Sequence, residues 1–264
     1  MNRRSFLIAT ATLGLAAWLP PAGSAAADEL HVVSSGGFSA AYRVLAPQFE
    51  RQSGMHLVTE WGPSMGNTPQ AVPARLARGE PIDVVIMVGY ALDDLVKQGK
   101  LTAGSGVQLA RSGIGVAVRA GAPKPDIATP EALKAALLAA TSVAYSDSAS
   151  GVYISTEMFQ RLGIAEAMAG KARMIPATPV GEVVARGEAE LGFQQLSELK
   201  PIAGIDIVGP LPPPLQKLTV FSAGIVAGSK EPAAAKALIA FLASPAAAQA
   251  IRDSGMEPIG SGEK

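Results

Sequence analysis

Short apolar segments alternate with longer segments of helical period along nearly the whole chain, and this alternation is the strongest constraint on the fold. Residues 83–88, which follow Pro81, form a nearly continuous apolar run of the kind found in central strands of parallel sheets. A helix is predicted directly after this run, over residues 91–98, and Gly99 closes it. Strands that alternate with helices in this way predict parallel sheets joined by right-handed crossovers. The chain is therefore predicted to be an α/β protein.

The remaining elements follow from the same pattern. A predicted helix opens at Thr129, a suitable cap, with proline in its first turn, and runs to residue 140. Pro69 and Pro73 cannot both lie inside a straight helix, so residues 62–69 are predicted to be an extended loop. The proline-rich residues 210–214 fit either a linker between lobes or a rigid loop within one domain. Predicted strands also cover residues 30–33, 55–61, 114–118, 143–145, 190–193, 205–208 and 219–226, and predicted helices 38–52, 71–78, 180–186, 232–244, 245–254 and a segment ending at 162.

The N-terminus has the composition of an export signal. Arg3 and Arg4 supply a basic start, residues 7–19 an apolar core and residues 25–27 a small-residue cleavage pattern. The apolar core is too short to span a bilayer comfortably, and no later segment is long and apolar enough to do so, so no stable membrane anchor is expected. Residues 1–27 are therefore predicted to be a signal peptide of a periplasmic protein. The arginine pair also fits a twin-arginine signal.

Composition excludes several classes of function. Basic and acidic side chains are equal in number, 22 of each, and no basic run is present, which argues against nucleic acid as a partner. The chain has no cysteine, so disulfides and thiolate metal sites are impossible. His31 and His56 are the only histidines, and both are interpreted as structural, which disfavours a zinc centre. No dinucleotide or phosphate-loop motif is present, and no cofactor is predicted.

Four junctions between a predicted strand and a predicted helix are rich in serine, threonine and glycine: residues 32–37, 61–66, 143–153 and 177–181. The backbone N–H groups at a helix N-terminus lack partners and carry the positive end of the helix dipole, so they bind anions without a cationic side chain. These junctions predict a cleft for a small oxyanion or a polycarboxylate. The candidate ligand-binding residues are Ser34, Ser35, Gly36, Ser64, Met65, Gly66, Ser146, Ser148, Ser150, Gly151, Tyr153, Thr178 and Val180.

Several of these residues have an ordinary structural interpretation as well. Ser34 and Ser35 could simply cap the following helix. Asp147 could be a general base or an N-cap, and beside a polyanion it would repel the ligand unless it were protonated. Tyr145 and Tyr153 could donate protons or hydrogen bonds, or could be core aromatics with a local hydroxyl partner.

Three further residues extend the candidate site. Arg173 could hold a carboxylate through two parallel hydrogen bonds, or could be a solvated arginine. Gln194 and Gln195 lie at the end of a strand, where alternation sends one side chain inward, so at most one is expected in the site. Glu60 could be a base, or could have a surface role. The candidates for proton transfer are Tyr145, Asp147 and Glu60.

Motifs distributed over nearly the whole mature chain resemble the periplasmic substrate-binding proteins of the molybdate-binding group. They are the Ser34-Ser35 turn, the loop at Ser64 and residues 79–85 and 186–192. The resemblance implies a two-lobe, type II periplasmic binding protein fold. Each lobe would be a mainly parallel sheet flanked by helices, with an anion between the lobes. We expect residues 28–112 and 217–264 to form lobe 1 and residues 113–216 to form lobe 2.

Other stretches depart from the molybdate-binding pattern and resemble aconitate isomerases, exported enzymes built on the same scaffold. These are residues 63–70, 143–153, 172–176 and 192–199, and the last contains Gln194 and Gln195 where the molybdate binders usually have a tyrosine. This resemblance implies interconversion of trans- and cis-aconitate by a 1,3-proton shift, without a cofactor. The alternative is a binding protein that delivers molybdate or a small organic anion to an ABC importer.

Overall fold

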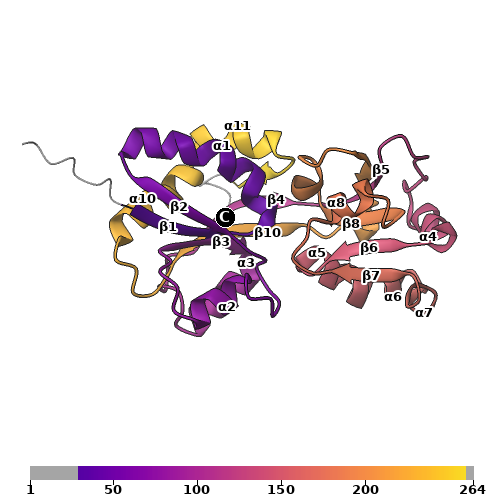
Figure 1. Ribbon diagram of the computed structural model, residues 1–264, viewed down its shortest axis with the longest axis horizontal. Helices are drawn as coiled ribbons and strands as arrows, with labels where there is room; N and C mark the ends of the chain where they lie inside the picture. The colour runs from indigo at the N-terminus through magenta and orange to yellow at the C-terminus, as the bar shows by residue number, and fades with distance from the viewer. Residues whose placement is uncertain (1–28, 260–264) are drawn as a thin grey trace, which may run out of the picture.

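The computed structural model describes residues 29–259, so the predicted signal peptide and residues 260–264 lie outside it. Figure 1 shows two lobes side by side along the long axis of the molecule, each a sheet with helices on its faces. The predicted two-lobe α/β fold is confirmed. None of the helices within residues 29–259 is by itself long and apolar enough to span a membrane, although two C-terminal helices, bent by 56°, reach that length and composition together.

The first lobe contains a six-stranded sheet in the order β11-β4-β10-β3-β1-β2. Strand β1 pairs in parallel with β2 and β3, whereas β10 is antiparallel to β3 and β4, and β11 is antiparallel to β4. The strands are β1 (Glu29–Ser34), β2 (His56–Trp61), β3 (Val84–Val88), β4 (Val107–Ser112), β10 (Thr219–Ile225) and β11 (Glu257–Pro258).

The second lobe contains a five-stranded sheet in the order β7-β6-β8-β5-β9. Strand β6 is parallel to β7 and β8, and β5 is antiparallel to β8 and β9. Both sheets are therefore mixed rather than mainly parallel, because β10 and β11 in the first sheet and β5 in the second run against the parallel strands. The chain passes between the lobes at β4–β5 and β9–β10. The strands are β5 (Ile114–Arg119), β6 (Val143–Ser146), β7 (Ala172–Ile175), β8 (Leu191–Gln195) and β9 (Ile205–Pro210).

The helices begin and end largely where local chemistry predicts. Thr129 caps α4 as expected, since its Oγ1 accepts a hydrogen bond of 3.1 Å from the backbone N–H of Ala132. Pro69 lies outside α2 and Pro73 in its first turn, so residues 62–69 form a loop as predicted, although bends and turns, not extended backbone, make up most of it. The helices are α1 (Gly36–Ser53), α2 (Val72–Ala77), α3 (Gly89–Lys97), α4 (Pro130–Ala139), α5 (Ala149–Tyr153), α6 (Phe159–Arg161), α7 (Ala165–Met168), α8 (Val180–Ala185), α9 (Leu196–Leu199), α10 (Pro232–Leu242) and α11 (Ala248–Asp253).

The predicted helix that ends at residue 162 is interrupted by a π-helical turn, Ile154–Met158. The hydroxyls of Ser155 and Thr156 donate to the carbonyls of Gly151 and Val152, at 2.9 and 2.7 Å. Such back-bonding competes with the regular helical ladder and often accompanies bends. Short 3-10 turns, Pro213–Leu215 and Pro245–Ala247, complete the elements.

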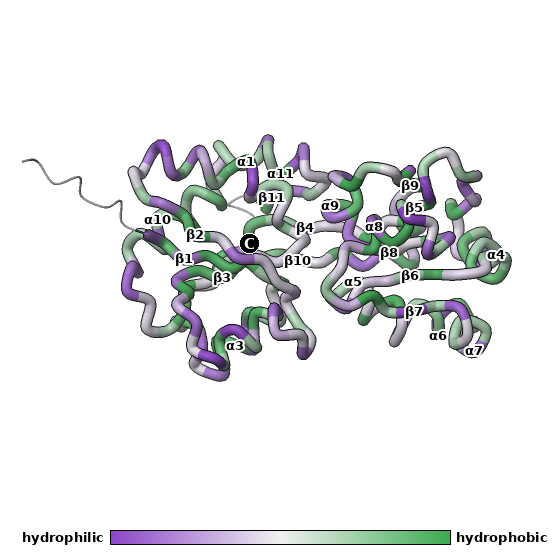
Figure 2. The backbone as a smooth tube through the Cα atoms, in the orientation of Figure 1, coloured by the Kyte–Doolittle hydropathy of each residue, from purple (hydrophilic) through white to green (hydrophobic). Residues whose placement is uncertain are grey.

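Each lobe has its own hydrophobic core. Phe38, Tyr42, Leu45 and Phe49 recur at helical spacing on α1 and pack against the first sheet. A separate cluster in the second lobe surrounds Phe193 of β8. Figure 2 shows the hydrophobic colour gathered on the strands inside both lobes. Two separate cores joined by a few crossing segments leave room for a ligand site between them.

Contacts beside the crossing strands also join the lobes. Helix α9 of the second lobe packs on α1 of the first. The amide of Gln195, at the end of β8, lies 2.9 Å from Thr219 Oγ1 on β10. The Ser197 hydroxyl, one residue into α9, donates to Ser112 Oγ of β4 at 3.4 Å. These contacts fix the end of β8 beside the junction of the lobes.

A substitution of Gly151 would test how closely α5 packs on β6. A Cβ at this position would overlap with the backbone carbonyl of Ser146. Gly151→Ala is therefore expected to destabilise the protein by about 1–3 kcal/mol, although alanine in a helix would otherwise stabilise it by about 1 kcal/mol. Thermal unfolding would show a melting temperature lower by several degrees. The matched control is Gly170→Ala, where a Cβ meets open space; equal melting temperatures for the two variants would contradict the close packing.

Candidate active site

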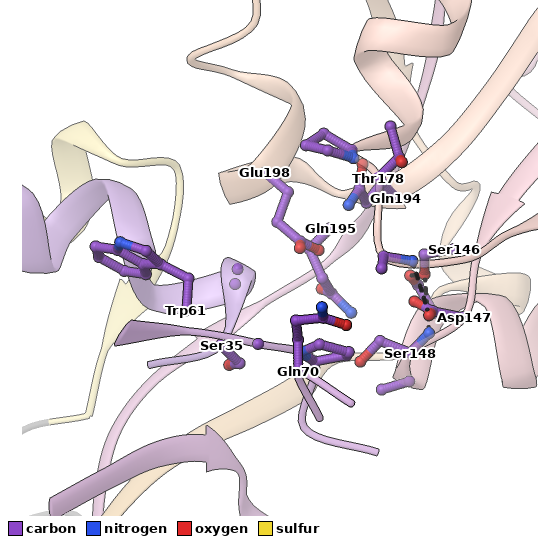
Figure 3. Close-up of a pocket in the computed structure, with 18 of the residues that line it drawn as sticks. Ser35, Trp61, Gln70, Ser146, Asp147, Ser148, Thr178, Gln194, Gln195 and Glu198 are labelled. Carbon is purple, nitrogen blue, oxygen red and sulfur yellow. Dashed lines mark hydrogen bonds between the residues drawn. The ribbon is translucent and has the colours of Figure 1, made fainter. Parts of the chain in front are cut away.

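A cavity of about 530 Å³ lies between the two lobes. Its walls are the first turn of α1 and the loop after β2 in one lobe, and the loops that follow β6, β7 and β8 in the other. Figure 3 shows labelled side chains from both lobes around this space. The predicted site residues that line the cavity are Ser35, Gly36, Ser146, Asp147, Ser148, Ser150, Thr178 and Gln194.

The first turn of α1 presents unpaired donors to the cavity. Ser35 occupies the N-cap position but makes no side-chain cap bond, and its buried hydroxyl has no hydrogen-bond partner in the described part of the chain. The first N–H groups of a helix have no intrahelical acceptor, and those of Gly36 and Gly37 belong to this turn. Ser34, in contrast, is fully buried and donates to the carbonyl of Ser35 at 3.2 Å. Of the two predicted serines, Ser35 lines the cavity.

Small hydroxyl side chains form the wall on the second lobe. Ser146 and Ser150 share a hydrogen bond of 2.9 Å between their Oγ atoms, and the N–H of Ser148 lies 3.4 Å from Ser146 Oγ. Gly151 does not line the cavity, but its lack of a side chain lets α5 lie against the end of β6. This wall therefore offers neutral donors without a positive charge.

Asp147 lines the cavity and also holds a strained loop. Its Oδ2 accepts a hydrogen bond of 3.0 Å from the N–H of Ala177, a non-glycine residue with a φ of 52°. A left-handed conformation at alanine is unfavourable and persists only where the surroundings impose it. The N-cap of α5 is Ser148, so Asp147 does not cap that helix. The loop also carries Thr178 into the cavity wall.

Glu198, in the short helix α9, is a cavity residue that sequence reasoning missed. It contacts the first turn of α1, where a Cβ on Gly36 would overlap with its carboxylate. The Gln194 side chain and the Gln195 backbone form hydrogen bonds with this carboxylate. Its place within the isomerase-like residues 192–199 was the available signal, but the burial of Glu198 is completed by the first turn of α1, in the other lobe.

The surroundings of Glu198 change its acidity. Burial raises its pKa to about 7, and the negative charge of Asp147 acts in the same direction, against the two hydrogen bonds, which lower it. The residue keeps partial exposure because it faces the cavity. The N-terminus of α1 favours the ionised form, but such an effect is typically worth about 1 kcal/mol or less, under one pKa unit. The carboxyl group therefore titrates near neutral pH.

Both glutamines at the end of β8 line the cavity, in contrast to the expectation that at most one would do so. Strand alternation does not apply here, since Gln195 is the residue at which the chain turns from β8 into α9. Gln194 Oε1 accepts a hydrogen bond of 2.8 Å from the N–H of Val180, which itself is buried behind the cavity wall. This bond orients the Gln194 amide toward Glu198.

The predicted loop at residues 64–66 does not line the cavity. Ser64 is fully buried, and its Oγ accepts a hydrogen bond of 3.0 Å from the N–H of Val88. Met65 and Gly66 continue the loop, where Gly66 has a φ of 93°. Ser64 therefore anchors the loop to the end of β3, and Gln70 from the same loop reaches the cavity instead.

Four other predicted residues lie away from the cavity lining. Tyr145 packs edge-to-face on Phe159, with ring centroids 6.2 Å apart. The Tyr153 hydroxyl donates to the carbonyl of Leu215 at 2.7 Å. Arg173 on the edge strand β7 donates to the carbonyl of Glu188 at 2.8 Å, and Glu60 forms an exposed ion pair with Arg75 at 3.3 Å. Of the three candidates for proton transfer, the structure brings only Asp147 to the cavity.

Arg43 was also missed by sequence reasoning. It is the one lysine or arginine among the described residues that line the cavity, and its Cζ lies 4.2 Å from the centroid of the Trp61 ring. It is seven residues after Gly36, which places both on one face of α1. That helical spacing was the available signal. An arginine stacked on tryptophan is held in place while its N–H donors stay free for a carboxylate.

Two α/β lobes, with a cavity between them that hydroxyl, amide and carboxyl side chains line, define a periplasmic binding protein architecture. The chain matches the family described as bacterial extracellular solute-binding protein over residues 30–257, and it belongs to that family. It is 56% identical over 230 residues to an aconitate isomerase from Pseudomonas sp., covering 87% of this chain and 88% of that protein.

The chain is also similar to the molybdate-binding protein ModA of Azotobacter vinelandii, at 28% identity over 263 residues, covering 95% and 98% of the two chains. The solved structure of the periplasmic molybdate-binding protein of that organism superposes with a TM-score of 0.68 at 25% identity, covering 86% of this chain and 98% of that one. The resemblance read from the sequence is confirmed.

The raised pKa of Glu198 predicts a specific dependence of stability on pH. A carboxyl group with a pKa near 7 in the folded state and near 4.5 in the unfolded state stabilises the protein below about pH 4.5, and that stabilisation is lost as pH rises through about 7. The variant Glu198→Gln has no carboxyl group to ionise at this position, so it does not lose this stabilisation as pH rises. Its free energy of unfolding should therefore rise relative to wild type by roughly 2–3 kcal/mol over this range and stay constant above it.

Urea unfolding at a series of pH values measures this difference. The exposed Glu166→Gln in the same lobe is the matched control, whose difference from wild type should not follow that curve. A Glu198→Gln difference that is independent of pH would show that the carboxyl group titrates normally.

Proposed function

We propose that the protein interconverts trans- and cis-aconitate in the cavity between its lobes. The observation that carries the proposal is the pairing of neutral donors and one arginine with a carboxyl group, Glu198, that titrates near neutral pH. The 56% identity to a protein named aconitate isomerase, over most of both chains, supports the same conclusion.

Binding requires donors for three carboxylates without a large excess of positive charge. The first turn of α1, the hydroxyls of Ser146 and Ser148 and the glutamine amides supply neutral donors. Arg43 supplies one guanidinium, whose planar fork matches a carboxylate. A tricarboxylate is large enough to contact donors from both lobes, whereas the reacting carbons between its carboxylates would lie near the centre of the cavity.

Isomerisation is a 1,3-proton shift. A C–H bond of the CH2 group of aconitate breaks, its electron pair spreads through the neighbouring double bond into a carboxylate, and a proton is added at the far carbon. The double bond moves by one position, and its new geometry makes the product cis. Donors fixed around the carboxylate that gains charge stabilise this dienolate. The reaction consumes no oxidant, reductant or second substrate, and the site must provide one group that accepts and returns the proton.

The second candidate function is anion capture for an ABC importer. The 28% identity to a molybdate-binding protein favours it. Such a receptor requires the same neutral donors, and closure of the lobes around the anion would be its working motion. The two carboxyl groups that line the cavity, Asp147 and Glu198, argue against it, because a receptor needs no ionisable group beside the anion, whereas an isomerase needs one to transfer the proton.

Export is part of the proposal. The family is described as extracellular, which agrees with a periplasmic location. Residues 1–27 would then be a signal peptide, and its Arg3-Arg4 pair fits a twin-arginine signal as well as an ordinary one. Export would place the cavity in the periplasm, where it would meet small anions that enter the cell envelope.

Purified protein is expected to convert trans-aconitate into cis-aconitate without an added cofactor. Chromatography of the two acids after incubation between about pH 6 and about pH 9 measures the conversion. Absence of conversion at every pH, together with tight binding of molybdate by calorimetry, would replace the isomerase proposal with the receptor.

Arg43 is expected to bind one carboxylate of the substrate. Charge-assisted hydrogen bonds are worth about 1.5–3 kcal/mol, and Arg43 is exposed at the rim, so Arg43→Gln should raise KM for trans-aconitate by roughly tenfold. Arg51→Gln, at the far end of the same helix, is the matched control and should leave KM unchanged. Steady-state kinetics check both, and equal KM values would remove Arg43 from the site.

A further inference from the structure

We propose that Glu198 is the catalytic group that takes the proton from one carbon of aconitate and returns it to the other. The inference rests on the proposed function. It assigns the proton transfer, which the neutral donors cannot carry out, to one residue. It concerns a residue of the isomerase-like stretch 192–199 that was not among the candidate site residues.

The position of Glu198 suits this role. It enters the cavity from α9, at the contact between the lobes, and lies against the first turn of α1. Figure 3 shows its side chain projecting into the space between Ser35 and Gln195. A tricarboxylate whose carboxylates reach the donors of both lobes would cross this space. Its carbons would then face the Glu198 carboxyl group.

The hydrogen bonds around Glu198 orient it. The Gln194 side chain is fixed by the N–H of Val180, at 2.8 Å, and forms a bond with the carboxylate together with the Gln195 backbone. A carboxyl group held in this way presents a fixed oxygen to the substrate rather than sampling many rotamers. Orientation of this kind is a large part of what an active site contributes.

The other carboxylates are less suited to proton transfer. Asp147 shares the cavity, but its Oδ2 is bound to the N–H of Ala177 and stabilises the left-handed residue there. Glu60 is paired with Arg75, and 61% of its side chain is exposed. Glu198 is the carboxyl group that faces the cavity from the junction of both lobes.

The electrostatic surroundings also favour exchange of a proton. The charged side chains that line the cavity with Glu198 are Asp147 and Arg43, and the positive end of α1 faces it from the first lobe. Burial raises its pKa to about 7, close to neutral pH, where a group is effective both as a base and as an acid. A bound polyanion would favour the protonated form further, which assists return of the proton.

One residue is sufficient to carry out the whole proton transfer. The ionised Glu198 oxygen takes a proton from the CH2 carbon, so that a C–H bond breaks and an O–H bond forms. The electron pair moves into the adjacent double bond and onto a carboxylate. The same O–H then protonates the carbon at the far end of the former double bond, which restores the Glu198 carboxylate and leaves the double bond displaced by one position.

The test compares wild type, Glu198→Gln and Glu198→Asp. General acid–base groups typically contribute about 10²–10⁴-fold, so Glu198→Gln should lower kcat by at least a hundredfold. Its dissociation constant for trans-aconitate, measured by calorimetry, should stay within about threefold of wild type. Glu198→Asp keeps the carboxyl group but withdraws it, so its kcat should fall less than that of Glu198→Gln. Glu166→Gln is the control for both.

The pH dependence separates catalysis from a structural role. Because the base must be ionised, kcat/KM of the wild type should fall as pH is lowered through about 7. In Glu198→Asp, this acidic limb of the pH profile should lie at a different pH. If the wild type is active, two results would overturn the assignment. One is a Glu198→Asp variant with the kcat and pH profile of the wild type, and the other is a Glu198→Gln variant that keeps more than a tenth of the wild-type kcat. A wild type that binds trans-aconitate without converting it would overturn the proposed function itself.

Discussion

The contact between Glu198 and the first turn of α1 is the interaction on which the cavity depends. It joins the two lobes, and Gly36 makes it possible because a side chain there would occupy the space of the carboxylate. The same contact contributes to the burial that raises the pKa of the carboxyl group to about 7. Joining of the lobes and tuning of the acid therefore have one physical origin.

The other polar groups of the cavity converge because of topology. Strands β6 and β8 are neighbours and parallel, so both end at one edge of the second sheet, and β1 ends opposite them in the first lobe. In open α/β sheets, ligands bind outside the carboxyl ends of the strands. Ser35, Ser146 and Gln195 each lie at such an end. Arg43 joins them from the side of α1 and brings the positive charge that the strand ends lack.

The fold was largely predictable, since buried strands and capped helices leave local signals. The apolar run in β3, the cap at Thr129 and the prolines before and at the start of α2 are examples. Strand β4 (Val107–Ser112) carries no such run and was not predicted. The antiparallel direction of β5 and β10 was also missed, because an apolar pattern records burial but not strand direction. The π-helical turn after α5 depends on hydroxyls that bond back to the preceding turn.

The sequence by itself determined the alternation of strands and helices, the neutral serine-rich strand ends and the family resemblance, because each depends on residues that are close together in the chain. Only the tertiary structure decided which of these residues share a cavity. It placed Ser64, Tyr145 and Arg173 outside the lining and brought Glu198 and Arg43 into it. The reason is that the acidity of a carboxyl group and the partner of an arginine depend on burial against residues far away in the chain.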